Sequence, residues 1–310
     1  MKVYKNPDRS EWADICLRPH LDVSSLNSAV SGILDDVRLR GDEAVKEYEA
    51  KFDHAVLGEL MVSEEEKAEA MASIDCELLE AIKLAHDNIY KFHKAQLMSV
   101  CKVETAPGVV CWQKQLPIER VGLYIPGGTA PLFSTVLMLA KIAGCSEIVL
   151  CTPPMADGKV NPAILAAADV VGVEKVFKIG GVQAIGAMAY GTQSVPKVYK
   201  IFGPGNQYVM AAKQHVSLHE VAIDMPAGPS EVCVIADAES NAEFVAADLL
   251  SQAEHGIDSQ VLLISTSEEK IDSVQQQIEL QLAKLPRREI AMKTLEYSKA
   301  VLVQNTDEAI

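Results

Sequence analysis

Short strand-like runs alternate with helical runs between residues 119 and 229, and this pattern constrains the fold more than any other feature of the chain. The strand-like runs read RVGLYIP, EIVLCTPP, KVFKIGG and KVYKIFGPG, and each is followed by an apolar helical pattern such as PLFSTVLMLAKIAG or NPAILAAADVVGV. A repeated strand–helix order of this length is typical of a parallel sheet with helices on both faces. We therefore predict an α/β fold.

The same order begins again at residue 231, with the strand-like runs EVCVIAD, QVLLIST and AVLVQ. Ser240 and Glu243 have the spacing of a capping box for the helix after the first of these runs. Residues 1 to about 100 read as mostly helical, and we expect this helical N-terminal part to pack on the unit that begins at residue 231. The prediction is two Rossmann-like parallel-sheet units, divided into an N-terminal arm (1–20), a discontinuous first domain (21–123 plus 230–310) and a second domain (124–229).

The length and charge of the chain exclude some classes of protein. The 310 residues suffice for two domains, and the net charge is -15, from 28 basic and 43 acidic residues. The sequence has no basic run, which argues against nucleic-acid binding, because neutralising phosphates needs clustered lysine and arginine. Apolar runs stay below membrane-spanning length, and the N-terminus has acids where a signal peptide has its apolar core. We expect a cytoplasmic protein without a membrane partner.

The cysteines give no sign of a disulfide framework or a metal knuckle. Seven are present, an odd number, and none forms a C-x-x-C pair. Several lie in apolar runs, which indicates reduced, buried thiols in a cytoplasmic protein. Cys151 directly follows a strand-like run, where a nucleophile could lie, but the sequence has no evident base beside it. A buried thiol is the favoured interpretation.

Three glycine-rich turns each follow a strand-like run and precede a helical one. They are Gly127-Gly128, Gly180-Gly181 and Gly203-Pro204-Gly205. Such turns let a backbone approach a phosphate at a helix N-terminus, although glycine also serves any tight turn between a strand and a helix, and none of the three matches G-x-G-x-x-G. A polar residue lies near each turn, namely Tyr124, Gln183 and Asn206. This recurrence favours a nucleotide site at the carboxyl ends of the strands.

The stretch DLLSQAEHG ends an apolar helical pattern with an amide and an imidazole. Gln252 and His255 are three residues apart, so they would lie on one helical face together with Leu249. A bound metal could explain two polar groups on an inward face, since amide oxygen and imidazole nitrogen are feasible ligands. Alternatively, His255 caps the helix before Gly256. The spacing alone favours the cap, because two ligands do not make a zinc site.

Two further features could belong to a site. His215 and His219 form an i, i+4 pair, but it lacks the glutamate of H-E-x-x-H and a visible third ligand, so a solvated helix end is favoured over a zinc hydrolase. Ser230, in the tight loop MPAGPSE between the two units, is a turn residue or a substrate contact.

Several long, ordered motifs resemble histidinol dehydrogenase. They are VGLYIPGGTAPLFSTVLMLA, GGVQAIGAMAYGT, IFGPGNQYV, DMPAGPSE and DLLSQAEHG, with VRLRGDEAVKEYEAKFD and NIYKFHKAQ in the N-terminal part. The resemblance covers almost the whole chain. It implies an NAD-linked, zinc-dependent homodimer that oxidises L-histidinol through L-histidinaldehyde to L-histidine, in the last steps of histidine biosynthesis.

The resemblance also implies roles for individual residues. Gln252 and His255 match zinc ligands that lie close to the bound L-histidinol, and Ser230 matches a substrate contact. The NAD contacts would be Tyr124, Gln183 and Asn206. In that family zinc positions the substrate, a histidine acts as general base and a glutamate activates water.

The end of the sequence departs from the family pattern. Asn305 and Glu308 signal the start of a helix, and the sequence stops at Ile310, inside its first turn. The family's catalytic glutamate–histidine pair, its remaining zinc ligands and the C-terminal tail that interlocks the dimer would all follow that point. We therefore expect a shortened chain that lacks the catalytic tail, is inactive by itself and dimerises weakly. The alternative is a short form that binds the dinucleotide without catalysis.

Overall fold

The computed structural model describes residues 1–17, 24–127, 141–225, 231–257 and 259–310. Contacts divide the chain into two compact units, which we call unit 1 (Met1–Leu21 with Ala227–Ile310) and unit 2 (Asp22–Pro226). Each is described by itself. Within the described residues, no helix combines the length and apolarity needed to cross a bilayer.

Unit 2 is built on a parallel five-stranded sheet with the strand order β6-β5-β4-β7-β8. The strands are β4 (Arg120–Tyr124), β5 (Glu147–Thr152), β6 (Lys175–Lys178), β7 (Lys200–Phe202) and β8 (Ala222–Ile223). The chain moves outward from β4 through β5 to β6 and then crosses to the other side of β4 to form β7. The reversal makes the carboxyl ends of β4 and β7 a topological switch point, where open sheets of this kind bind their ligands.

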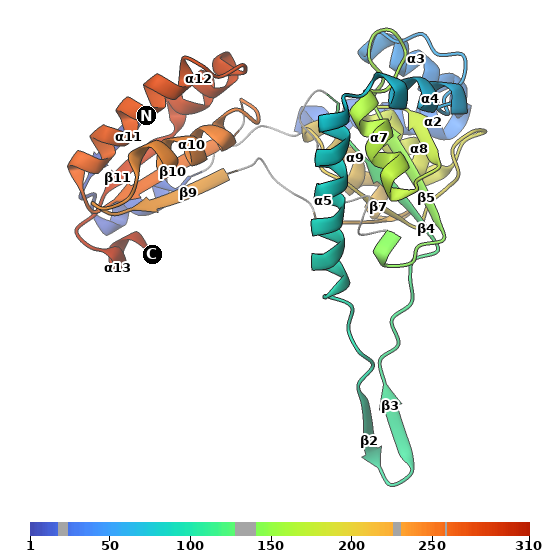
Figure 1. The fold of residues 1–310 in the computed structure, drawn as a ribbon, viewed down its shortest axis with the longest axis horizontal. Helices are drawn as coiled ribbons and strands as arrows, with labels where there is room; N and C mark the ends of the chain where they lie inside the picture. Colours follow the sequence, from blue (N-terminus) through green and yellow to red (C-terminus); the bar gives the residue numbers. More distant parts are fainter. Residues whose placement is uncertain (18–23, 128–140, 226–230, 258) are drawn as a thin grey trace. The chain divides into compact units, whose positions relative to one another are not determined.

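Helices cover both faces of this sheet (Figure 1). One face carries α2 (Ser24–Arg40), α3 (Asp42–Phe52), α8 (Gly181–Tyr190) and α9 (Gln207–Ser217), and the other carries α4 (Glu64–Ser73), α5 (Cys76–Lys94) and α7 (Pro162–Val171). Alternate residues of β5 belong to the two cores, Val149 and Cys151 to the first and Ile148 and Leu150 to the second. This period of two follows from the pleat of a strand.

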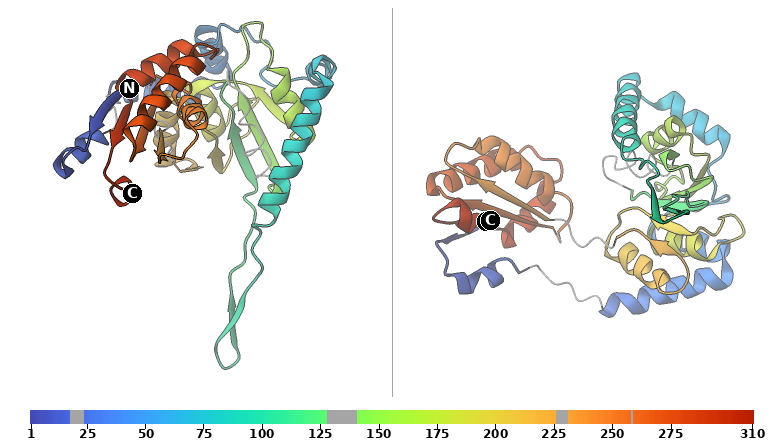
Figure 2. Two further views of the ribbon diagram at one scale, coloured as in Figure 1. Left: turned by 60° about the vertical axis from the view of Figure 1, so that its left-hand side comes forward. Right: turned by 90° about the horizontal axis from the view of Figure 1, so that it is seen from below.

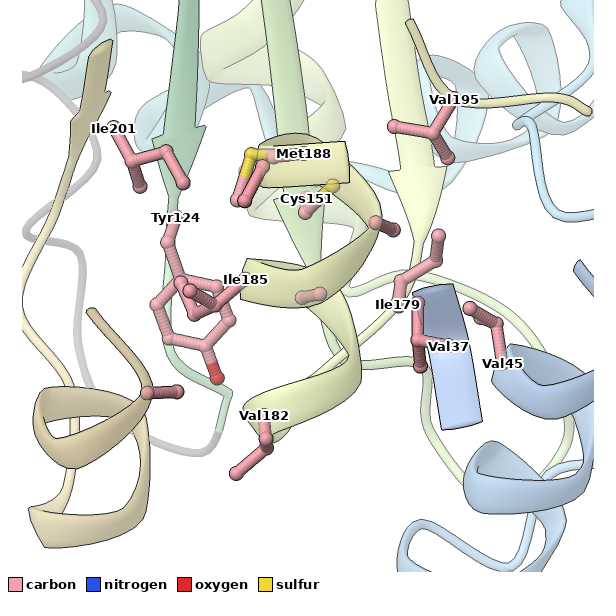
Figure 3. Packing of buried hydrophobic residues seen from close by; sticks show 14 of the residues in the cluster. Val37, Val45, Tyr124, Cys151, Ile179, Val182, Ile185, Met188, Val195 and Ile201 are labelled. Atoms are coloured by element: carbon pink, nitrogen blue, oxygen red, sulfur yellow. The ribbon is translucent and has the colours of Figure 1, made fainter. Parts of the chain in front are cut away.

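The first core joins the N-terminal helices to the sheet. Val37 of α2 and Val45 of α3 are fully buried in the same cluster as Ile185 and Met188 of α8 and Tyr124 of β4. Figure 3 shows these side chains together. The helices of residues 24–52 therefore belong to the unit whose sheet they cover.

A hairpin of β2 (Lys102–Ala106) and β3 (Val109–Trp112) extends from the body of unit 2 (Figures 1 and 2). The two strands are antiparallel, and every residue in them is exposed. Its apolar side chains include Val103, Val110 and Trp112. The sequence analysis did not anticipate this hairpin. A two-stranded ribbon is marginally stable in water by itself.

Unit 1 contains a parallel four-stranded sheet with the order β1-β11-β10-β9. The strands are β1 (Lys2–Lys5), β9 (Glu231–Ala236), β10 (Gln260–Ser265) and β11 (Lys299–Leu302). The helices are α10 (Ala242–Ala253), α11 (Glu268–Leu282) and α12 (Arg288–Tyr297), with short turns at η1 (Arg9–Glu11), α1 (Trp12–Ile15) and α13 (Thr306–Ala309). The fold class, two parallel-sheet α/β units with a helical N-terminal part, is thus as predicted.

The domain boundaries differ from the expected ones. Residues 21–123 were expected to join 230–310, but residues 22–226 form one unit. The reason is the apolar face of α2 and α3, which packs on α8 and α9. The arm of residues 1–20 is also more than an arm, because β1 adds a parallel strand beside β11.

Several local expectations can be checked directly. Asn305 caps α13 as predicted, accepting a hydrogen bond from the Glu308 N–H at 3.0 Å. The expected capping box at Ser240 is wrong, because Asn241 is the N-cap of α10 and accepts from the Glu243 N–H at 2.9 Å. The Ser240 hydroxyl instead donates to Asp237.

The prediction of buried cysteines holds for one of the seven. All seven are free thiols, but Cys151 alone is buried, Cys145 is half-buried, and Cys16, Cys76, Cys101, Cys111 and Cys233 are exposed. Burial raises the pKa of the Cys151 thiol. Cys151 therefore stays protonated and unreactive, which agrees with its interpretation as a core residue.

Candidate functional site

The carboxyl ends of β4, β6 and β7 bring together two of the three predicted glycine turns. Tyr124 ends β4 and is only 4% exposed. Its hydroxyl oxygen accepts a hydrogen bond from the Gly181 N–H at 3.1 Å, which ties β4 to the start of α8. Burial raises the pKa of this phenol, so Tyr124 stays a neutral hydrogen-bonding group.

Gln183 lies one turn into α8 and is 1% exposed. Its Nε2 donates to Glu49 Oε1 at 2.8 Å, and the Gly180 N–H donates to the same oxygen at 2.9 Å. The sequence analysis missed Glu49. Its sequence signal was the i, i+4 spacing of two acids, Glu49 in α3 and Asp53 directly after the end of that helix.

The turn after β7 is fixed by an ion pair between buried Lys213 and half-buried Asp224. The Gly203 N–H donates to Asp224 Oδ2 at 2.9 Å, and Lys213 Nζ donates to the Gly203 carbonyl at 2.7 Å and to Asp224 Oδ1. Lys213 is 1% exposed. Gly203 has a φ of 128°, and a Cβ built on it would lie 2.0 Å from the Tyr124 carbonyl oxygen. Only glycine fits this close approach between the ends of β4 and β7.

Three of the four other described glycines of the turns are explained by protein contacts. A Cβ on Gly127 or Gly180 would lie 2.7 or 2.6 Å from Pro153 side-chain atoms, and a Cβ on Gly205 would lie 2.3 Å from Val209. Tight packing of turns against the protein therefore accounts for these glycines without a phosphate. Gly128 lies outside the described residues.

Asn206 begins α9 beside this edge. Its Oδ1 accepts hydrogen bonds from the Tyr208 and Val209 N–H groups, both at 3.1 Å, and the residue is exposed. The cap satisfies two N–H groups of the first turn, and the residue stays exposed while it does so. Of the three polar residues predicted for a nucleotide, Asn206 is thus open to a ligand, whereas Tyr124 and Gln183 are buried behind the turns.

Gln252 and His255 lie at the C-terminal end of α10, but not as the sequence suggested. Gln252 is half-buried, and its Nε2 is buried without a hydrogen-bond partner in the described part of the chain. His255 follows the helix and is exposed, so the expectation of an inward-facing pair is wrong for the imidazole. Because α10 leads back from β9 to β10, this end lies at the amino edge of the unit 1 sheet.

These two residues do not complete a zinc site by themselves. Structural and catalytic zinc sites use three or four protein ligands, and no group of three or more histidine, cysteine, aspartate or glutamate side chains with metal-binding geometry occurs among the described residues. The buried atom of Gln252 without a partner is its amide nitrogen, a hydrogen-bond donor, whereas a metal would be bound by the amide oxygen. Ser230, the predicted substrate contact, lies outside the described residues.

The rival histidine pair is solvated. His215, in the last turn of α9, and His219, just beyond it, are both exposed. This agrees with the solvated helix end that the sequence favoured.

Comparisons with known proteins agree on one family over nearly the whole chain. A sequence model described as histidinol dehydrogenase matches residues 16–310. Histidinol dehydrogenase from Bacteroides thetaiotaomicron is 62% identical over 100% of this chain and 73% of its own length, and that from Xanthomonas oryzae pv. oryzae is 55% identical over 97% and 71%. The crystal structure of histidinol dehydrogenase from Elizabethkingia anophelis superposes with a TM-score of 0.95 at 48% identity, covering 100% of this chain and 72% of that one. The chain belongs to the histidinol dehydrogenase family.

Proposed function

We propose that this chain carries the dinucleotide site and part of the metal and substrate site of an enzyme that oxidises L-histidinol through L-histidinaldehyde to L-histidine. The oxidant would be NAD⁺, which accepts a hydride from the substrate carbon in each of the two steps. We also propose a cytoplasmic enzyme of histidine biosynthesis that works as a homodimer, and the exposed hairpin β2–β3 offers one surface for a second copy.

The observation that carries the dinucleotide proposal is the construction of the switch point in unit 2. Gly203 approaches Tyr124 so closely that the ends of β4 and β7 form one edge, and exposed Asn206 opens α9 directly beside it. A helix N-terminus at a switch point favours the pyrophosphate of a dinucleotide. In this proposal Asn206 contacts NAD⁺, and Tyr124 and Gln183 hold the turns against which it binds.

An Asn206→Asp variant tests this site without removing the cap. Aspartate keeps the acceptor for the Tyr208 and Val209 N–H groups but adds a negative charge where the pyrophosphate would bind. We expect NAD⁺ to bind about tenfold more weakly by isothermal titration calorimetry, with unchanged thermal stability. Asn241→Asp makes the same change at the N-cap of α10 and should leave NAD⁺ binding intact. Equal affinities in both variants would contradict the assignment of Asn206.

For the metal, we propose that Gln252 and His255 supply two of the zinc ligands and that Ser230 contacts the substrate beside them. Two donors leave the coordination incomplete, so the 310-residue polypeptide should retain little zinc and form no NADH from L-histidinol. A chain extended to the length of its relatives should retain about one zinc ion and turn over. NADH formation by the 310-residue polypeptide would contradict the proposed inactivity. NAD⁺ binding without turnover in the extended chain would instead favour the non-catalytic alternative.

The ligand role of His255 has its own test. In the extended chain, we expect His255→Ala to abolish zinc retention, because the variant lacks one of the protein ligands that hold the metal. Elemental analysis after dialysis measures the zinc content. His219→Ala replaces another exposed histidine and should retain the metal. Normal zinc content in the His255 variant would end the assignment.

A further inference from the structure

Glu49 is a buried carboxyl that no cation balances among the described ion pairs. It is fully buried on α3, and its Oε1 accepts the Gly180 N–H and the Gln183 amide. Its other oxygen, Oε2, is buried and meets no hydrogen-bond donor in the described ranges, although the Glu49 side chain is within hydrogen-bond reach of the Asp53 carboxyl. Gln183 Oε1 likewise meets no donor there. When Glu49 is ionised, both of these oxygens are hydrogen-bond acceptors, so neither can act as a donor to the other. A proton on Oε2 would provide the donor that this cluster lacks.

The groups around Glu49 explain why such a proton would stay. Asp53 lies one helical turn further on and reaches the same turn, since a Cβ on Gly180 would lie 3.2 Å from Asp53 Oδ2. The other titratable groups that face the pair from packed elements are Tyr124 of β4 and Cys151 of β5, both neutral, and His54 beside Asp53. Two ionised carboxylates in this interior would repel each other and lose their hydration.

We propose that Glu49 is a positioning residue for the dinucleotide edge, where it holds one proton with Asp53 and fixes the turn from Gly180 to Gln183 against Tyr124. This inference rests on the proposed function, because it assigns Glu49 a part in binding NAD⁺. Glu49 acts through the turn: Gly180 and Gln183 bond to it directly, and the next N–H, of Gly181, bonds to the Tyr124 hydroxyl.

The direction of the pH dependence follows from the carboxyl's surroundings. Burial, and then repulsion from Asp53, raises the pKa of Glu49 from 4.5 to about 8. Between these two values the folded chain keeps a proton that the unfolded chain has released, so this contribution to stability is complete below pH 4.5 and is lost as the pH rises through about 8. Ionisation also places a negative charge behind the turn, which should weaken binding of an anionic dinucleotide.

A Glu49→Gln variant separates this role from simple packing. Glutamine keeps the acceptor for Gly180 and Gln183, and its amide N–H groups replace the proton on Oε2 permanently. We expect NAD⁺ affinity of the wild-type chain, measured by calorimetry, to fall roughly fivefold between pH 7 and pH 9, the effect of one added charge near the ligand. The Glu49→Gln variant should bind equally at both pH values. Glu43→Gln, which removes an exposed carboxylate from the same helix, should follow the wild-type profile.

A second variant and a second readout complete the test. Glu49→Ala removes the acceptor as well, so it should weaken NAD⁺ binding at both pH values, and rescue by Glu49→Gln would exclude a requirement for negative charge. The denaturation midpoint of the wild-type chain should fall more steeply from pH 5 to pH 9 than that of Glu49→Gln. If the Glu49→Gln variant shows the wild-type pH profiles of binding and stability, the inference about Glu49 is overturned, and the dinucleotide proposal is unaffected. Failure of the wild-type chain to bind NAD⁺ at either pH would instead contradict the dinucleotide proposal.

Discussion

Gly203→Ala is expected to destabilise unit 2 by about 3–5 kcal/mol, the sum of strain at a positive φ and overlap with rigid backbone. The new Cβ would lie 2.0 Å from the Tyr124 carbonyl oxygen at a φ of 128°. Backbone atoms on both sides are fixed by the sheet, so the overlap could be relieved only by separating the ends of β4 and β7. Chemical denaturation with a probe in unit 2 measures the loss.

The chain offers a matched control for this substitution. Gly32 lies inside α2, and a Cβ built there would meet nothing within 4 Å. Alanine at this position should stabilise the helix by about 0.5–1 kcal/mol, because glycine loses more backbone freedom on folding. Equal effects at Gly203 and Gly32 would show that the close approach to Tyr124 does not constrain the fold.

Asp224→Ala is expected to cost about 3–5 kcal/mol, because it leaves the buried ammonium of Lys213 without its counter-ion. Lys213 is 1% exposed and would keep only the Gly203 carbonyl as an acceptor. The variant also removes the acceptor of the Gly203 N–H. Since these groups fix the turn at the switch point, NAD⁺ binding should weaken together with the stability of unit 2.

Two further variants separate the ion pair from general charge effects. In the double variant Asp224→Ala with Lys213→Met, no unpaired charge remains, so part of the lost stability should return. Glu220→Ala removes a carboxylate that pairs with Lys197 at 3.2 Å and with Arg38 at 3.4 Å. The side chains of Lys197 and Arg38 are 47% and 63% exposed. We expect this variant to change the free energy of unfolding by no more than about 1 kcal/mol. An equal cost for Asp224→Ala and Glu220→Ala would contradict the special role of the pair that Asp224 forms with buried Lys213.

The sequence by itself determined the parallel α/β class of each unit, because alternating strand and helix patterns and local caps are short-range signals. The strands after residue 119 and the cap at Asn305 follow from periodicity and from hydrogen bonds to nearby N–H groups. The motifs around Tyr124, Gln183, Asn206, Gln252 and His255 were sufficient to indicate the family, whose sequence model matches residues 16–310.

Only the tertiary structure decided which surfaces those elements meet. An amphipathic helix shows which of its faces is apolar but not which sheet will cover it, and so α2 and α3 were assigned to the wrong unit. For the same reason the sequence could suggest that Gln252 and His255 share an inward face, although His255 is exposed beyond the helix end. Glu49 illustrates the limit most clearly: its burial and its bonds to Gly180 and Gln183 join residues more than 130 positions apart, and no local pattern encodes such contacts.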